Sequence, residues 1–576
     1  MNTKINSVIQ SKHRDRRSRV GASLLSMGVF LLAFAVCDRS TAAKVPPEAP
    51  LFEKMGSHQR KITTDNPKAQ DYFNQGLIWM YAFNHDEAIR SFTSAAQIDD
   101  DCAMAWWGIS LAAGPQYNHP VMNEERTATA WGAMQKALER IGHANPVERA
   151  LIEALKKRNA ETLLNEEARM THNEAYATAM GEIWETNRND SDVGTLFAEA
   201  MMVCRPRRLF LPDHSPHEDT PMIFATIARV MKIDPGNPGA LHLWVHAIEL
   251  SETPDLGLPA ADALGNLVPA SGHLLHMPAH IYVQTGRWEK AISQSEKAMA
   301  SDKNYRVLSS EHLALKPTQH VYMTHNAHML AYAAMMSGRE KEAMAAARDM
   351  WANIDETTLR KIGPAVDRWW CSVYDVQKRF GRWDAILAEP APPSSMPITT
   401  ATWRAARAVA FAAKKDFVNA RSEYKAFQIA EASIPTDYPW GQDSALKVLK
   451  VSDRFILGEI ALQNDDWGTA SEMLEEAAKF EDNLAYGKPP QWLQPVRHTL
   501  GAVYLKRGKF EDAERVYRED LAKWRDNGWS LYGLSRALEG QGKAGEAAEV
   551  MAEHLRIWAK ADGPITTSCK CILGQD

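Results

Sequence analysis

The stretch Leu500-Gly501-Ala-Val-Tyr504, followed by Gly508-Lys-Phe510-Glu-Asp-Ala513, decides the fold. A similar order recurs at Leu457-Gly458 and Asp466-Trp467-Gly-Thr-Ala470. Other segments share these small residues and the turn that follows them, and they span 69–100, 272–302, 325–350, 366–387, 401–427 and 531–551. About eight units in one register predict an array of antiparallel helix pairs, because a single pair cannot bury its apolar faces alone.

These units resemble the tetratricopeptide repeat, in which small residues let two helices approach closely and an aromatic residue fills the turn between them. The resemblance implies an all-α fold, a superhelical solenoid of antiparallel helix pairs whose first helices line a concave surface. The composition agrees, since Ala, Leu, Met, Glu, Lys and Arg dominate over Val and Ile and favour helix over strand. Residues 101–270 fit the register less well, and four prolines between 205 and 222 predict a long loop there.

The body of the chain also resembles a group of exported bacterial tetratricopeptide-repeat proteins. The likeness is carried by Gln70-Asp-Tyr-Phe-Asn-Gln-Gly76, Cys102-Ala-Met-Ala-Trp-Trp-Gly108, Phe197-Ala-Glu-Ala-Met-Met202 and Gly272-His-Leu-Leu-His-Met-Pro-Ala-His-Ile-Tyr282. It covers most of residues 60 to 390. It implies the repeat fold and an exported protein, and it implies no particular activity.

The first 43 residues have the features of an export signal. Six basic residues between 4 and 19 precede an uncharged run at 20–36. Cleavage at the small residues 40–43 is one interpretation, and a lipidated N-terminus at Cys37 is a second. The third is that the run itself anchors the chain in a membrane. Each predicts a periplasmic or otherwise exported protein, with membrane contact only through this segment or a lipid on Cys37.

The rest of the chain divides at its proline-rich segment. We expect an N-terminal array at 60–388, a linker at 389–398, a C-terminal array at 399–560 and a tail at 561–576. Cys569 and Cys571 in the tail suit a soft metal such as Cu(I), but a disulfide or a disordered tail explains them equally well. Three other cysteines lie in apolar helical contexts and are expected to be buried: Cys102, Cys204 and Cys371.

Charge and motifs exclude several functions. The net charge is −6 and the body of the chain has no block of Lys and Arg, which argues against nucleic acid as a partner. The sequence has no phosphate loop, Rossmann glycine fingerprint, Gly-x-Ser-x-Gly elbow or His-Glu-x-x-His motif. A repeat array without these motifs predicts a protein or peptide partner, here in the cell envelope.

Histidine is concentrated in the stretch 241–329. Nine of the 19 histidines lie between 242 and 328, at steps of three, four and seven that place side chains on one helix face. Imidazole suits Zn, Cu, Fe and Ni. The candidate metal ligands are His242, His246, Glu249, His273, His276, His280, His325 and His328. Because their segments are successive first helices of the repeat register, we expect the side chains to share one concave surface.

Several neighbours of these residues qualify the prediction. Pro278 lies between His276 and His280 and removes the backbone hydrogen bond to the carbonyl of Leu274, so it predicts a kinked helix. Tyr282 and Met277 lie near the cluster in sequence, and Asn326 is a candidate supporting amide. We expect the remaining histidines of interest to lie apart from the ligands: His312 and His320 in a connecting segment, His214 and His217 in the loop, and His85 in a structural role at a turn.

Two hypotheses of function remain open at this point. In the first, the solenoid is an exported scaffold that offers a groove to a peptide or protein. In the second, it is a metalloenzyme, an oxidase or a hydrolase, with a His/Glu site in the middle of the array. The same histidine face could also bind an anionic peptide or simply pack. Ring nitrogens that converge within about 4–5 Å would favour the metal, since metal–nitrogen bonds are about 2 Å long.

Overall fold

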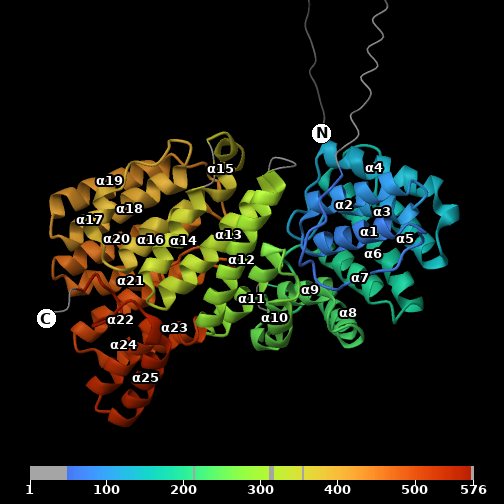
Figure 1. The fold of residues 1–576 in the computed structure, drawn as a ribbon. Helices are drawn as coiled ribbons and strands as arrows, with labels where there is room; N and C mark the ends of the chain where they lie inside the picture. The colour runs from blue at the N-terminus through green and yellow to red at the C-terminus, as the bar shows by residue number, and fades with distance from the viewer. Residues whose placement is uncertain (1–47, 212–214, 311–316, 353, 355, 573–576) are drawn as a thin grey trace, which may run out of the picture. The chain divides into compact units, whose positions relative to one another are not determined.

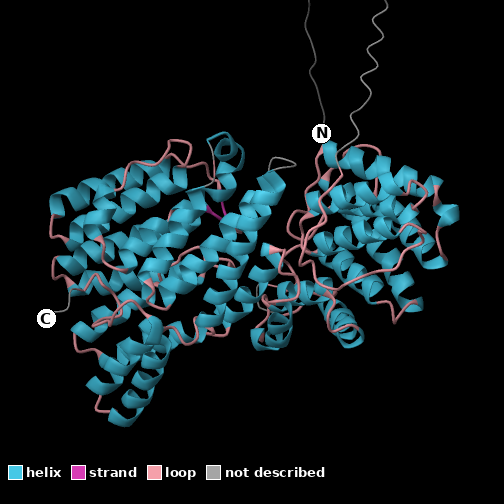
Figure 2. Cartoon of the chain, viewed as in Figure 1, coloured by secondary structure: helices cyan, strands magenta, loops and turns pink. Residues whose placement is uncertain are grey.

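Helix follows helix through the computed structural model, which describes residues 48–211, 215–310, 317–352, 354 and 356–572 (Figures 1 and 2). The first α-helices are α1 Pro67–Tyr81, α2 His85–Ile98, α3 Ala103–Ala113, α4 Glu124–Glu139, α5 Pro146–Arg158, α6 Glu166–Thr186, α7 Ser191–Cys204, α8 Thr220–Ile233, α9 Pro238–Ile248, α10 Leu258–Leu264, α11 Gly272–Gln284, α12 Trp288–Ser310 and α13 Pro317–Met336. The others are α14 Glu340–Ala352, α15 Glu356–Trp370, α16 Ser372–Arg379, α17 Trp383–Ala388, α18 Pro397–Ala413, α19 Phe417–Ala432, α20 Ala445–Gln463, α21 Trp467–Asp482, α22 Val496–Lys506, α23 Phe510–Lys523, α24 Gly528–Gly540 and α25 Ala544–Ile557.

Other regular structure is sparse in the part of the chain that the structure describes. Short 3₁₀ helices occupy Ile141–His143, Pro254–Gly257 and Trp558–Lys560. Two-residue strands, β1 Pro439–Trp440 and β2 Asp443–Ser444, pair antiparallel. The predicted all-α class is confirmed.

Some predicted features lie outside the described residues. The export signal at 1–43 with Cys37, the histidines 214 and 312, and the last four residues of the tail are among them. None of the described helices combines the length and the apolar character that crossing a bilayer requires.

Most helices pack antiparallel against the next one along the chain, as in α1 with α2, α11 with α12 and α13 with α14. The sequence starts several of them with a capping side chain: Asn66, Asn237 and Ser271 accept hydrogen bonds from backbone N–H groups in the first turns of α1, α9 and α11. The turn after α13 needs a left-handed residue, and Gly338 supplies it with φ of 74°. Capping and turn residues thus set where each pair begins and reverses.

Aromatic side chains fill the space that small residues leave between neighbouring pairs. A Cβ atom on Gly76 of α1 would lie 2.7 Å from the ring of Phe92 on α2, and one on Gly108 of α3 would lie 2.6 Å from it. Tyr517 of α23 sits in the same way between Gly501 and Gly533. In these two units one ring therefore packs a helix pair against the next, as the repeat pattern predicts, whereas Gly458 of α20 packs against Leu474 of α21.

The helices that carry the histidines are neighbours. Helix α11 contacts α9 on one side and α13 on the other. Pro278 lies inside α11, which remains helical from Gly272 to Gln284. His320 is in α13, so the prediction that it belongs to a connecting segment is wrong: the helix starts at Pro317, a residue favoured in the first turn. The predicted loop is also shorter, since α8 starts at Thr220.

The C-terminal residues fold back onto earlier helices. The backbone N–H of Asp562 donates to the carbonyl of Gly338 at 3.0 Å, and Arg379 donates to the carbonyl of Ser568 at 2.8 Å. Cys569 and Cys571 form a disulfide, and both are buried. Of the alternatives for this pair, the structure contains the disulfide. Cys102, Cys204 and Cys371 are buried free thiols, as expected.

Candidate metal centre

The candidate centre lies where α9, α11 and α13 meet. Along each helix the histidines are separated by mostly apolar residues, which belong to the core. The histidines face the neighbouring histidine-bearing helix and most are buried with that core. His242 and His276 have no exposed surface, and the side chains of His246, His273, His280 and His328 are also buried. Only His325 is partly exposed among the predicted ligands. Helical spacing has therefore placed a set of polar rings inside the protein.

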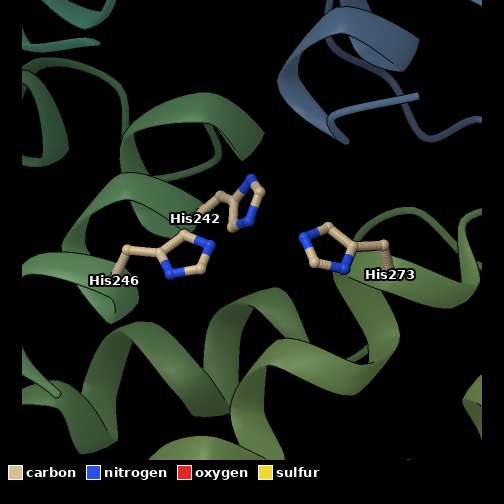
Figure 3. Close-up of side chains that lie close together, drawn as sticks. All are labelled: His242, His246 and His273. Carbon is tan, nitrogen blue, oxygen red and sulfur yellow. The ribbon is translucent and has the colours of Figure 1, made fainter. Parts of the chain in front are cut away.

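One set of three histidines, the first triad, consists of His242 and His246 on α9 and His273 on α11. One ring nitrogen from each lies within 4.8 Å of the other two. Figure 3 shows the three rings directed toward one another from two helices. Their centroids are 4.8 Å apart for His242 and His246, and 4.9 Å apart for His242 and His273.

A second triad consists of His276 and His280 on α11 and His325 on α13. It meets the same 4.8 Å criterion. The Nε2 atoms of His276 and His280 are 2.8 Å apart, and the ring of His325 is 4.6 Å from that of His276. The i, i+4 step across Pro278 therefore still brings two imidazoles together. The triads adjoin, since the rings of His273 and His276 are 6.3 Å apart.

Glu249 joins the two triads. It follows α9 directly, and its Oε1 accepts a hydrogen bond from Nδ1 of His246 at 3.0 Å. Its Oε2 accepts from Nδ1 of His280 at 2.7 Å and from the hydroxyl of Tyr486 at 2.8 Å. The carboxylate thus orients one ring in each triad through the nitrogen that faces away from the partner rings.

Hydrogen bonds of this kind fix the protonated nitrogen of three rings. Nδ1 of His242 donates to the carbonyl of Tyr81 at 2.6 Å, as Nδ1 of His246 and His280 donate to Glu249. A ring that donates from Nδ1 keeps a lone pair on Nε2. The Nε2 atoms of His242 and His246 have no protein partner in the described part of the chain, and neither nitrogen of His273 has one.

Burial keeps the rings neutral. It lowers the pKa of His242, His273, His276 and His325 well below the usual value, and repulsion between the neighbouring imidazoles adds to the shift. Burial also lowers the pKa of His246, against the attraction of Glu249. The pKa of the Glu249 carboxyl is held well below its ordinary value by His280 and His246, although burial opposes this. The centre therefore offers neutral nitrogen donors from His242, His246, His273, His276 and His325, together with one carboxylate.

A cavity of about 200 Å³ opens beside the triads. Its wall includes His246, His273, His280, His325, His328 and Glu249. His242 and His276 lie behind these residues and do not line the cavity. The structure thus brings all the predicted ligands into one region.

His328 belongs to neither triad. Its ring lies 5.8 Å from that of Trp369, and burial lowers the pKa of His328 to about 3. Tyr282 donates to Asp262 and Asn326 donates to Asp302, so neither supports a histidine ring. His217 does not line the cavity, whereas Met277 does. His85 is buried and bonded to the carbonyl of Ala112, which agrees with a structural role.

Several residues of the cavity wall were not predicted from the sequence. They come from distant segments: Tyr117, Arg207, Tyr322, Arg368, Trp369, Trp440, Tyr486 and Lys488. One signal was available, because Tyr486-Gly-Lys-Pro-Pro490 interrupts the repeats between α21 and α22. Loops that interrupt a regular array often carry function.

Comparison with known proteins identifies one repeat by sequence. The model of the tetratricopeptide repeat matches residues 498–528, which include most of α22 and all of α23. A search of curated proteins by sequence finds no match. The chain therefore contains one repeat that matches the tetratricopeptide-repeat model, within an all-α array of stacked helix pairs.

Two solved structures align with most of the chain at low similarity. The human IFIT1 dimer with PPP-AAAA is 12% identical, with 86% of this chain and 92% of that chain covered and a TM-score of 0.29. The APC/C hetero-tetramer Cut9–Hcn1 is 13% identical, with 86% and 74% covered and a TM-score of 0.28. Scores this low carry no argument about fold or function.

Proposed function

We propose that this protein is a metalloprotein in which the two histidine triads hold transition-metal ions beside the cavity. The observation that carries the proposal is the hydrogen bonding of His242, His246 and His280. Each donates from Nδ1 to an oxygen and directs Nε2 at a neighbouring ring, which is how metal-binding histidines are held.

The donor set fits a metal of the zinc, copper and iron group. Three neutral imidazoles suit such ions, whereas Ca²⁺ and Mg²⁺ prefer oxygen ligands. Nitrogens bound to one ion at about 2.0–2.1 Å lie roughly 3–4 Å apart. The Nε2 atoms of His276 and His280, at 2.8 Å, already have nearly this spacing, and the first triad needs only small ring rotations.

The cavity gives the proposed centre access to small molecules. An ion bound by three histidines has a free coordination position, and a metal in such a site supplies Lewis-acid or redox chemistry. The chain's own contribution is to fix the rings, to keep them neutral and to hold Glu249 as a carboxylate between the triads. These features support an enzyme of the oxidase or hydrolase type.

Metal analysis of the purified full chain tests this proposal. After removal of metal with a chelator and reconstitution with Zn, Cu or Fe, we expect about two ions per chain, one per triad. The double variant H276A/H280A should retain about one ion, and H242A/H246A should do the same. H554Q is the matched control, because His554 is also buried and bonded to a backbone carbonyl but lies in α25. Wild-type protein without metal above background would sink the proposal.

A second candidate is a protein-binding scaffold, which the tetratricopeptide repeat at 498–528 favours. Repeat arrays of this kind commonly bind peptides or proteins on their inner surface. Together with the predicted export signal, it suggests a partner in the cell envelope. Capture of the same partner by wild-type protein and by H276A/H280A would support this role independently of the metal.

A further inference from the structure

The cavity beside the triads is bordered by positive charge that has no counter-ion. Arg368 and Lys488 are partly buried in its wall, and Arg207 is exposed at its edge. None of the three forms an ion pair with a carboxylate in the described part of the chain. Arg207 donates one long hydrogen bond, 3.4 Å, to the side chain of Asn118.

Neither acidic side chain of the cavity wall forms an ion pair with these cations, although the charge of Glu249 attracts Lys488. Asp375 is 3.0 Å from the ammonium of Lys378. Both oxygens of Glu249 are occupied by His246, His280 and Tyr486. Burial lowers the pKa of Lys488 to about 7 and that of Arg368 to about 10. Partly buried cations without a partner are costly, and an anion bound among them would remove that cost.

The remaining wall is aromatic. The guanidinium of Arg368 lies 4.4 Å from the ring of Trp369, and Trp369 in turn stacks on His325. Tyr322 lies 4.5 Å from His273. Tyr117 is 2% exposed, and its hydroxyl has no hydrogen-bond partner among the described residues. The ammonium of Lys488 lies 4.2 Å from the ring of Trp524. Flat apolar faces, a free hydroxyl and cations without a carboxylate partner together match a planar ring with an acidic group.

We propose that the cavity binds a small aromatic carboxylate, with its carboxylate near Arg368, Lys488 and Arg207 and its ring against Trp369 and Tyr322. A volume of about 200 Å³ suits a single substituted ring and excludes a folded peptide. The bound ring would lie beside His273 and His325, one from each triad. Any chemistry on the bound ring rests on the proposed function, but binding of the anion does not require the metal.

Calorimetric titration of the metal-free full chain with benzoate tests the inference. We expect benzoate to bind and neutral benzyl alcohol to bind at least about tenfold more weakly, because charge-assisted hydrogen bonds carry the recognition. Added salt should weaken the binding of benzoate. Equal affinity for the two compounds, or affinity for inorganic phosphate equal to that for benzoate, would overturn the inference.

Charge-removing variants identify the residues. R368Q and K488Q should each weaken benzoate binding by about tenfold or more. R421Q and K303Q, at exposed positions on α19 and α12, should leave it unchanged. Unchanged affinity in both R368Q and K488Q would contradict the assignment. Circular dichroism shows whether each variant is folded. If R368Q does not fold, the affinity of K488Q for benzoate and the salt titration of the wild type test the inference instead.

The outcomes separate this inference from the metal site. Benzoate binding by a protein that takes up no metal would overturn the proposed metal function alone. A chain that binds metal but binds benzoate no more tightly than benzyl alcohol would overturn the present inference alone.

Discussion

At the scale of single residues, the histidine cluster is costly unless something binds it. Seven buried ring nitrogens on six of the predicted ligands have no hydrogen-bond partner among the described residues. Each such atom costs about 1–3 kcal/mol, and a whole domain is stable by only about 5–15 kcal/mol. A metal bound in the first triad would satisfy three of these atoms, Nε2 of His242 and of His246 and one nitrogen of His273. The energetic balance therefore agrees with the hydrogen-bond pattern in favouring a metal centre over simple packing.

Another buried histidine gives a prediction on pH. Burial lowers the pKa of His85 from 6.5 to about 3, and the charge of Arg126 contributes. The unfolded chain therefore binds a proton at His85 that the folded protein rejects. Stability is complete above about pH 6.5 and falls as pH decreases toward 3. At about pH 5 the loss from this residue is about 2 kcal/mol.

The variant H85Q checks this prediction, because glutamine can donate to the carbonyl of Ala112 and does not titrate. Urea denaturation of both proteins at several pH values gives the free energy of unfolding. We expect the advantage of the wild type over H85Q to shrink as the pH is lowered. A constant difference between pH 7 and pH 4 would contradict the lowered pKa.

At the scale of helices, the close approach of glycine and aromatic side chains should dominate local stability. Gly108→Ala would place a Cβ 2.6 Å from the ring of Phe92, which is fixed between α1 and α3. We expect it to destabilise the protein by about 1–3 kcal/mol. Gly132→Ala is the control, because no atom lies within 4 Å of its added Cβ in the middle of α4. It should stabilise by roughly 0.5–1 kcal/mol. Thermal unfolding of both variants measures the contrast, and equal effects would rule out the packing argument.

The same scale shows why the sequence predicts helices well and the cavity only in part. Repeated glycines, alanines and aromatic residues specify each helix pair locally, so the class of fold follows from the pattern. Histidines at steps of three and four reveal their common face for the same reason. Tyr486 and Lys488 reach the cavity from more than 150 residues away in the chain. Their position beside the cavity depends on how the helix pairs stack, and no local spacing in the sequence encodes that stacking.

Two outcomes at particular residues illustrate the limit. Pro278 predicts a kink that leaves the spacing of His276 and His280 open, and in the structure α11 includes Pro278 and the two Nε2 atoms are 2.8 Å apart. Glu249 has the spacing of a ligand on the same stripe as His242, but it lies just past the end of α9. From there its carboxylate reaches two rings on different helices. The spacing of His276 and His280 and the position of the Glu249 carboxylate therefore both depend on tertiary packing.

At the scale of the whole described chain, contacts cross the proline-rich segment between α17 and α18. Trp288 donates to the carbonyl of Arg525 at 3.1 Å, Trp529 donates to that of Met335 at 3.0 Å, and Tyr486 donates to Glu249. The apolar core around the histidine helices also includes Trp403, Leu493 and Trp524. The cavity is therefore built by residues from both sides of this segment.

These contacts predict that the peptide bond between Pro393 and Ser394 can be cut without separating the two sides. Both residues are exposed, and they lie in the connection between α17 and α18, so a protease site inserted there is accessible. Because buried tryptophan and tyrosine contacts hold the parts together, the nicked protein should elute from gel filtration at the size of the intact chain. It should also keep its metal content. Urea added to the nicked sample provides the control, since it should release both fragments. Separation of the fragments on dilution in native buffer would show that the core does not continue across the segment.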